Sequence, residues 1–209
     1  MTVTSAAAHT RTAHDRVLHG WYMYDWANSA FAVTILSALF GPYLDKVVVP
    51  AGGVDLPLLG MHALSATSLY GYALGISALL VLLSSPILGA IADSTSAKKP
   101  FLMFFCYLGS SASLLMFFIG EGDVTMAIML FMIANFSFVS ANVFYDAFLP
   151  HIASPDMQDM VSGKGYAYGY AGGGLLFMLQ LLLVVFFLRL VLNSMVLTSI
   201  LLSGMVVIS

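Results

Sequence analysis

Long stretches of this chain carry no charged residue. They are 26–44, 56–92, 101–120, 124–145, 165–188 and 190–209. Each is close to or above the roughly 20 residues that a helix needs to cross the hydrocarbon core of a bilayer. Transmembrane β-strands are only about 10 residues long and alternate apolar with polar residues, a pattern that this sequence lacks. The sequence therefore predicts an all-α polytopic membrane protein.

The overall composition excludes a water-soluble domain. Of the 209 residues, 60% are hydrophobic and only 8% are charged, whereas a soluble domain carries roughly 25% charged residues. So few charges could not cover the surface of a soluble fold of this size, and we expect the lipid bilayer as a partner. The net charge of −3 gives no indication of a nucleic-acid partner.

The charge-free stretches set the predicted domain organisation. We predict a polar cytoplasmic tail at 1–20 and a membrane unit at 21–209 with helices at 23–44, 66–92, 101–120, 124–148, 165–188 and 192–209. The tail has no apolar core, so it is not a cleavable signal peptide. The last helix has no polar residues after it. We expect a chain truncated within that helix; the alternative is a short C-terminus that just clears the bilayer.

The basic residues predict the orientation in the membrane. With the N-terminus in the cytoplasm, the cytoplasmic segments would contain five of the seven Lys and Arg residues. Cytoplasmic loops of membrane proteins carry such an excess of positive charge. We therefore predict a cytoplasmic N-terminus in the cell (inner) membrane, and six crossings would return the chain to the same side.

Small residues follow one side of the predicted helix 66–92. Gly71, Gly75, Ala78, Ser85 and Gly89 recur at helical spacing. Small residues let membrane helices approach closely, so we predict helix packing here. The line runs on to Asp93, where a carboxylate at a helix C-terminus opposes the macrodipole and needs a partner.

The loop after this helix resembles the signature loop of the major facilitator superfamily. It reads Gly89-x-x-x-Asp93 and closes with the basic pair Lys98 and Lys99. Two positions depart from the pattern: Ser94 stands where the family has a basic residue, and Ser96 where it has a glycine. The resemblance implies that this loop acts as a cytoplasmic gating latch.

Three other segments resemble one branch of that superfamily, the branch typified by vacuolar amino-acid effluxers. They are "YDWANS" at 24–29, "DAFLP" at 146–150 and "SGKGYAYGY" at 162–170. The resemblance implies a twelve-helix transporter built from two six-helix halves, which moves small solutes, plausibly amino acids, by alternating access. This chain would supply the N-terminal half, and a second six-helix half would be its partner.

Polar residues lie within the predicted spans on shared helix faces. Asn135, Asn142 and Asp146 are separated by seven and four residues, and Asp25 and Asn28 by three. A polar stripe on a membrane helix faces the bundle interior or a water-filled cavity. We predict that these residues line a substrate cavity or gate; for Asp25, capping of the first helix is the alternative. If transport is coupled to an ion, we expect a proton, carried by Asp25 and Asp146.

The predicted helix 165–188 opens with a doubled Gly-x-x-x-Gly pattern. Gly165, Gly169 and Gly173 recur every four residues, and Gln180 continues the same face. We predict that the glycines form a close helix crossing. Gln180 contacts substrate or, equally, bonds a neighbouring helix.

The alternatives to transport are a non-transporting membrane scaffold, an intramembrane enzyme and a pore; the sequence has no run that resembles a selectivity filter. None of the five histidines lies in a predicted span, so no histidine base can reach the serines of "GSSAS" at 109–113. Asp146 and His151 lack further ligands at metal-binding spacing. We therefore predict a small-molecule substrate and no catalytic residue, metal or cofactor.

Overall fold

The computed structural model describes the backbone of residues 2–56, 60–94 and 97–208, and the side chains of 14–55, 60–91, 93–94 and 97–187. The α-helices are α1 (Thr2–Ala30), α2 (Phe40–Tyr43), α3 (Ala66–Ser94), α4 (Lys98–Leu115), α5 (Val124–Asp146), α6 (Leu149–Ile152) and α7 (Gln158–Ile208). Wider or tighter turns form η1 (Phe31–Leu39), η2 (Leu44–Val48) and η4 (Met116–Phe118). The fold is thus built almost entirely of helices, as the sequence predicts.

Five helices of the described part are long and apolar enough to cross a membrane. They are His14–Val48, Ala66–Ile91, Lys98–Phe118, Val124–Ile152 and Gln158–Phe187. Each contains most of one of the first five predicted spans. The expected all-α polytopic membrane fold is therefore confirmed in its architecture, while the number of spans needs a separate account.

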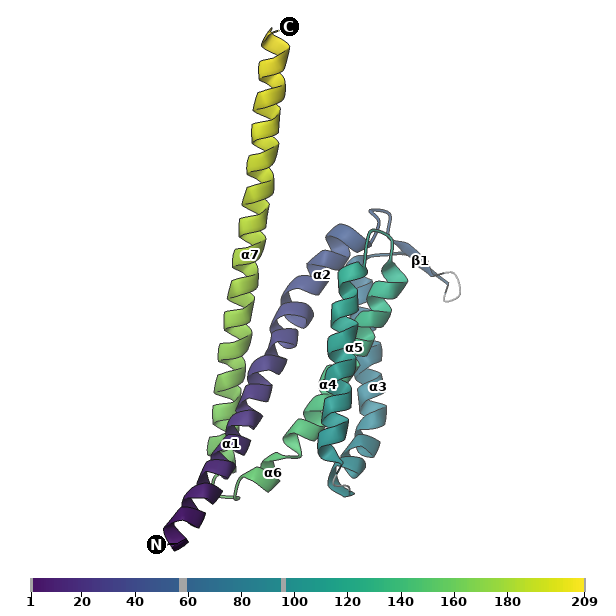
Figure 1. The fold of residues 1–209 in the computed structure, drawn as a ribbon. Helices are drawn as coiled ribbons and strands as arrows, with labels where there is room; N and C mark the ends of the chain where they lie inside the picture. Colours follow the sequence, from purple (N-terminus) through teal and green to yellow (C-terminus); the bar gives the residue numbers. More distant parts are fainter. Residues whose placement is uncertain (1, 57–59, 95–96, 209) are drawn as a thin grey trace.

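The sixth span, predicted at 192–209, lies beyond the residues whose side chains are described. The backbone of α7 passes through this region as one helix of 51 residues, with no break between the fifth and sixth predicted helices. Such a helix is about 77 Å long, more than twice the roughly 30 Å of hydrocarbon in a bilayer. Because α7 does not turn back, the two ends of the chain lie at opposite ends of the molecule (Figure 1). The six-helix count is not confirmed.

The first span is one continuous helical rod with changes of pitch. The helix begins at Thr2, before the span itself, so the described part of the predicted polar tail is helical and continuous with the membrane helix. Within η1 the turns widen: the N–H of Phe40 bonds to the carbonyl of Ile35, and the Ser37 hydroxyl to that of Ala32. Pro42 follows in α2 and has no N–H to donate, which interrupts regular α-helical bonding at this point.

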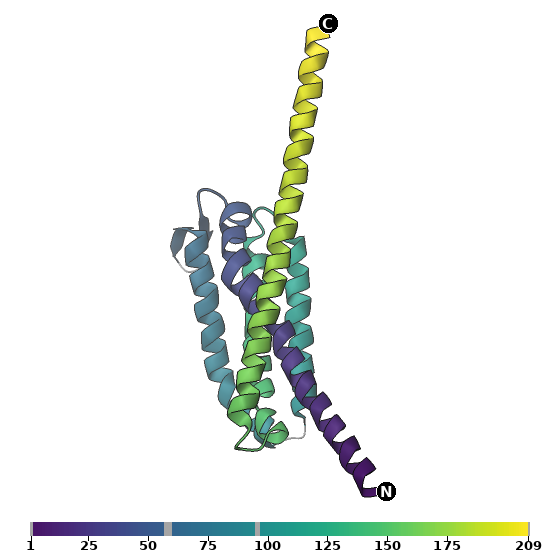
Figure 2. The ribbon, with the colours of Figure 1, turned by 90° about the vertical axis from the view of Figure 1, so that its left-hand side faces the viewer.

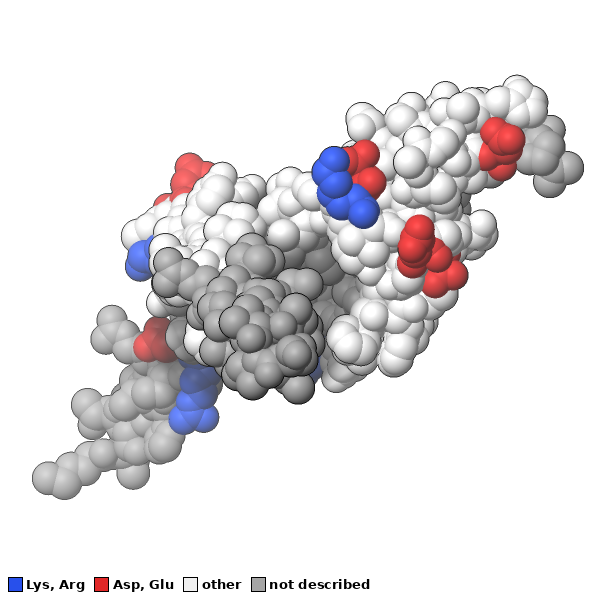
Figure 3. Space-filling view, turned by 90° about the horizontal axis from the view of Figure 1, so that it is seen from above, with Lys and Arg blue, Asp and Glu red and all other residues white. Residues whose placement is uncertain are grey.

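The spans are arranged as a group of three helices beside a crossed pair. α5 contacts both α3 and α4, and α1 contacts α7. Figures 1 and 2 show α1 running between α7 and the group of three, with the upper part of α7 standing free of the other helices. α5 is the most buried span, while α3, α4 and α7 expose large apolar side chains suited to lipid. Seen from above, the described atoms are mostly uncharged (Figure 3).

Two packed regions hold the ends of the bundle together. At one end, Phe40 stacks on Phe131 with ring centroids 4.4 Å apart, in a cluster with Leu44 and Leu69. At the other end, Trp21 packs with Tyr145 and residues of the α6–α7 connection. The first cluster fixes the C-terminal part of the first span against α3 and α5, and the second fixes α1 against α5 near the start of α7.

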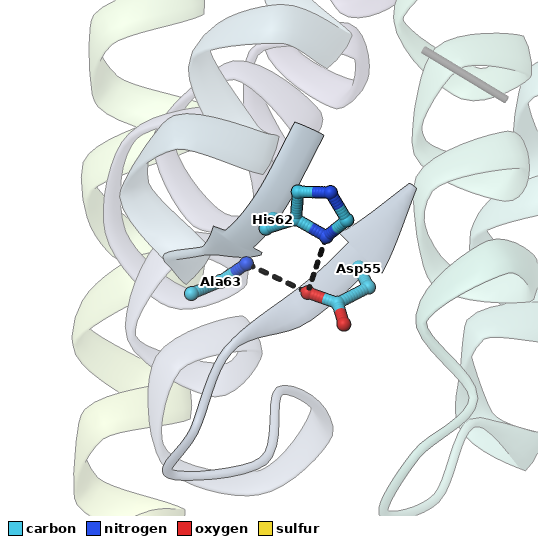
Figure 4. A network of polar contacts seen from close by, with 3 residues as sticks. All are labelled: Asp55, His62 and Ala63. Atoms are coloured by element: carbon cyan, nitrogen blue, oxygen red, sulfur yellow. Dashed lines mark hydrogen bonds and ion pairs between the residues drawn. The ribbon is translucent and has the colours of Figure 1, made fainter. Parts of the chain in front are cut away.

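A small hairpin joins η2 to α3. Its strands are β1 (Val54–Leu56) and β2 (Met61–Leu64), paired antiparallel. The Asp55 carboxylate accepts a 2.8 Å hydrogen bond from the N–H of Ala63 and lies 3.7 Å from Nδ1 of His62 (Figure 4). Both side chains of the ion pair are exposed, so the pair contributes little stability.

Candidate functional site

The glycines of α7 lie where this helix crosses α1. A Cβ on Gly165 would come within 2.5 Å of the Trp21 ring, and one on Gly169 within 2.7 Å of the Asp25 carboxylate. A Cβ on Gly173 would lie 2.8 Å from the Val33 side chain. All three predicted packing glycines are therefore in close contact with α1, and no larger residue fits without movement.

Gly172, which lies beside the Gly165, Gly169 and Gly173 line, belongs to the same crossing. A Cβ there would collide with the backbone carbonyl of Trp26 and with its indole. Backbone cannot swing aside as a side chain can, so this is the tightest point of the crossing. A Cβ on Gly174, two residues further along the chain, would meet no other group within 4 Å.

The small-residue line of α3 has a different environment. Gly71 and Gly75 are exposed, and neither they nor Gly89 would bring a Cβ within 4 Å of another group. The buried face of α3 is formed instead by Leu69 and Ala73, one turn apart. The predicted packing role of the α3 glycines stays a prediction, because they pack against no other helix in the described part of the chain.

A cavity of about 500 Å³ opens between the first span, α4, α5 and α7. Its polar lining consists of hydroxyl, amide and thiol groups, without a charged side chain: Tyr24, Asn28, Thr34, Cys106, Ser110, Ser113, Ser137 and Gln180. The rest of its wall is apolar, with Phe31, Phe105 and Phe138. This combination of an apolar wall with a few polar groups is typical of small-molecule sites.

Two hydrogen bonds tie the first span to its neighbours beside this cavity. The Thr34 hydroxyl donates to Oε1 of Gln180 over 2.7 Å, and Nδ2 of Asn28 donates to Oδ1 of Asn142 over 2.8 Å. The hydroxyls of Tyr24 and Ser137 are buried and have no partner among the described residues. A buried hydroxyl without a partner is costly, and neither oxygen has appreciable accessible surface.

A second, smaller pocket of about 140 Å³ lies near the start of α7. It is lined by Trp21, Asp25, Asn142, Tyr145, Asp146, Leu149, Ser162 and Tyr166. It brings together carboxylates from α1 and α5 that are 121 residues apart in the sequence. Asp25 is half-buried and Asp146 is exposed, and neither has a hydrogen bond or ion pair to a described residue.

A stack of three aromatic rings joins the pocket to the cavity. Tyr145 stacks with Trp21, whose ring centroid is 4.4 Å away, and with Tyr24, at 5.0 Å. The indole N–H of Trp21 donates to the backbone carbonyl of Tyr145 over 3.2 Å. The stack therefore fixes the ring of Tyr145, whose buried hydroxyl has no hydrogen-bond partner among the described residues.

The predicted cavity or gate residues divide between the two hollows. Asn28 and Gln180 line the cavity, whereas Asp25, Asn142 and Asp146 line the small pocket. Asn135 is buried in α5 and lines neither of them. The structure thus places five of these six residues at one hollow or the other, while their roles in transport stay predictions.

The loop between α3 and α4 is described except for residues 95–96. Lys98 is buried, and its Nζ donates to the carbonyl of Ala147 over 3.3 Å and lies 3.4 Å from Nε2 of His151. A cation is favoured at a helix C-terminus, so Lys98 joins the start of α4 to the end of α5. Asp93 and Lys99 are exposed, and the gating role of the loop stays a prediction.

Sequence reasoning missed most of the cavity lining. Ala134, Ser137, Phe138 and Ala141 form the face of α5 that lines it, at the spacing of one helix face. The long polar side chains of α5 lie on the stripe that contains Asn135. This stripe is offset by one residue, or about 100° of rotation about the helix axis, from the face that lines the cavity. The available signal was the excess of small residues at 109–113 and on this face of α5.

Comparison with known proteins gives a consistent result. Residues 13–209 match the family model described as "Vacuole effluxer Atg22 like". The uncharacterized MFS-type transporter YxiO of Bacillus subtilis is 31% identical over 166 residues, which cover 79% of this chain and 37% of that protein. Autophagy-related protein 22 of Pyricularia oryzae is 25% identical over 166 residues, 68% of this chain and 24% of that protein.

Autophagy-related protein 22 of Eremothecium gossypii is also 25% identical to this chain. The match extends over 193 residues and covers 76% of this chain and 38% of that protein. The chain therefore spans well under half the length of these curated relatives. No solved structure gives a significant match to the chain.

Proposed function

Because the chain belongs to the Atg22-like family of vacuole effluxers, we propose that it forms one wall of the solute pathway of a membrane transporter. The family and its relatives support membrane transport. The observation that carries the proposal is the cavity of about 500 Å³ between the first span, α4, α5 and α7. Its volume is in the range of sites for small molecules, roughly 300–1,000 Å³.

We propose small polar solutes, amino acids among them, as the transported class. The hydroxyl and amide groups of the lining offer hydrogen bonds, and the aromatic wall offers apolar contact. The described lining has no charged side chain, so a charged end of the solute would be bound outside this cavity. Catalysis is no part of the proposal, because the family is one of transporters.

We propose alternating access as the mechanism. A second six-helix half would close the open side of the cavity, and one half would move against the other. Within this half, the glycine crossing would let α7 pivot on α1 as the halves move, because it is a close contact with few interlocking side chains on the α7 side. The loop with Lys98 would act as a cytoplasmic latch, with the N-terminus in the cytoplasm of the cell.

A vesicle experiment tests this function. The 209-residue chain is reconstituted with and without the co-expressed C-terminal half of a family member, and uptake of a labelled amino-acid mixture is followed. We expect saturable uptake only when both halves are present, because the cavity needs both walls. Ser110→Phe should abolish it by filling the cavity, whereas Leu108→Phe, on the other side of α4, should not.

Two results would contradict the proposal. One is robust uptake by the chain alone. The other is uptake by the assembled pair that Ser110→Phe leaves unchanged, because a solute that passes a filled cavity does not use it.

A further inference from the structure

The amide of Gln180 makes one hydrogen bond and leaves its nitrogen free beside the cavity. Oε1 accepts the hydrogen bond that the Thr34 hydroxyl donates over 2.7 Å, and Nε2 bonds no described residue. Both residues line the cavity of about 500 Å³. Gln180 is half-buried, and its Nε2 keeps accessible surface, in contrast to the fully buried hydroxyls of Tyr24 and Ser137. The amide therefore has N–H donors available to a group inside the cavity.

The bond from Thr34 decides which end of the amide is left for a solute. Thr34 is buried, and its hydroxyl makes this one hydrogen bond to the described residues. Because a hydroxyl hydrogen needs an acceptor, donation to Oε1 leaves Nε2 as the free end of the Gln180 amide. A reversed amide would take this acceptor away from the buried hydroxyl, which is costly. Thr34 is therefore a positioning residue for Gln180.

A second amide of the cavity presents the opposite atom. Nδ2 of Asn28 donates to Oδ1 of Asn142, on α5, over 2.8 Å, whereas Oδ1 of Asn28 bonds no described residue. The cavity thus offers an amide acceptor near α5 and the amide donors of Gln180 on α7. The described lining contains no charged side chain. The donors of Gln180 are therefore suited to a neutral oxygen atom of a solute.

We propose that Gln180, oriented by Thr34, is the residue by which this cavity recognises a neutral oxygen acceptor of the solute. The proposal rests on the transport function proposed above and narrows its solute class: the part of the solute inside the cavity carries a carbonyl, ether or hydroxyl oxygen. A solute that lacks this oxygen leaves the N–H groups of Gln180 unpaired. Sites built around a hydrogen bond reject apolar isosteres for this reason.

Competition between two isosteric amino acids tests the assignment. O-Methylhomoserine has an ether oxygen and no donor in its side chain, and norleucine has a methylene group in place of that oxygen. Each is added unlabelled to vesicles that contain the chain and the co-expressed C-terminal half, and the concentration that halves uptake of the labelled amino-acid mixture is measured. The ratio of the norleucine to the O-methylhomoserine concentration is the acceptor preference. Gln180→Met keeps the length of the side chain without its donors and should lower this preference about fivefold, the factor that corresponds to one hydrogen bond.

Three further variants separate recognition from stability. Thr34→Val keeps the shape of the side chain and frees the amide to reverse, so it should lower the acceptor preference by a smaller factor. Thr34→Ser retains the hydroxyl and should retain the preference. Gln158→Met makes the same change at a glutamine outside the cavity, which bonds the carbonyl of Ala153, and should leave the preference unchanged. In a variant without measurable uptake, the two affinities are compared through the rise of the unfolding midpoint that each ligand causes.

The outcomes distinguish this assignment from the transport function. An acceptor preference that Gln180→Met leaves unchanged overturns the assignment, because the oxygen is then recognised elsewhere. A preference that rises in Gln180→Met also overturns it, since Oε1 rather than Nε2 then faces the solute. Equal effects of Thr34→Val and Thr34→Ser overturn the positioning role of Thr34. In all three cases uptake by the parent pair stands, and so does the transport proposal. Absence of uptake by the parent pair overturns the transport proposal, and this assignment with it.

Discussion

Two helices of this protein carry glycines at the same spacing, and only one of them uses these glycines for packing within the described chain. On α7, Gly165 and Gly169 are buried against α1. On α3, Gly71 and Gly75 are exposed, and a Cβ on either of them would meet no other group within 4 Å. Spacing shows that a helix permits close approach; the partner decides whether the approach takes place.

The partner of α7 explains the difference. The side chains that fill the groove over Gly165 and Gly169 are Trp21 and Asp25 of α1. Because Gly169 has no side chain, the Asp25 carboxylate lies directly against α7, at the edge of the small pocket. The glycine line therefore does more than bring two helices together: it makes room for Asp25, a polar residue of the small pocket.

The largest expected effect comes from filling the α7 groove. Gly169→Leu and Gly172→Leu should each destabilise the chain by about 3 kcal/mol, since overpacking of a closed contact is costly. Gly172→Leu should be the worse of the two, because its Cβ meets the backbone of Trp26. Thermal unfolding in detergent, followed by circular dichroism, measures both.

Gly174→Leu is the matched control, because Gly174 has no neighbour within 4 Å. It should leave the midpoint of unfolding close to that of the parent chain. Equal losses for positions 169, 172 and 174 would show that the helix itself, rather than the crossing, is sensitive to leucine, and the comparison of α7 with α3 would fail.

The same comparison shows what sequence could predict. The existence of five spans followed from charge-free length, because the bilayer imposes that length on any helix that crosses it. The glycine contacts of α7 required in addition that α1, far away in the chain, present Trp21 and Asp25 to them. Periodicity within one helix contains no information about the residues of another, so the same pattern on α3 led to an expectation that has no support in the described chain.

The candidate site was predictable to a similar extent. Carboxylates in a membrane span need a partner or water, which singles out Asp25 and Asp146 from the sequence, and the structure brings both to one pocket. The cavity was not found, since its hydroxyls come from small residues such as Ser110 and Ser137. Serines are common in membrane helices as packing residues, and only the fold distinguishes those that line a hollow.

A smaller effect is expected further along the same crossing. Thr34→Val removes the hydrogen bond to Gln180 and leaves the amide of Gln180 without this partner. Interhelical hydrogen bonds in membranes are worth about 1 kcal/mol, so the loss should be about that size. Gln180→Leu should cost a similar amount, and the double variant no more than either single change, because both remove one bond. Additive losses in this cycle would show that Thr34 and Gln180 stabilise the crossing independently.

The smallest effect is expected on α3. Gly75→Leu adds an apolar side chain at an exposed position with no atom nearby, on a helix whose outer face already carries Leu79 and Leu82. Leucine also favours the helix over glycine by up to about 1 kcal/mol. The unfolding midpoint of the chain should therefore stay level or rise slightly, in contrast to Gly169→Leu under the same conditions.

A fall as large as that of Gly169→Leu would mean that α3 packs closely against a second copy of the chain. Crosslinking through a cysteine at Ile76, in a Cys106→Ser background, would then detect a dimer that Gly75→Leu abolishes. An unchanged midpoint and no crosslink would leave the glycines of α3 as a face that this chain does not use by itself.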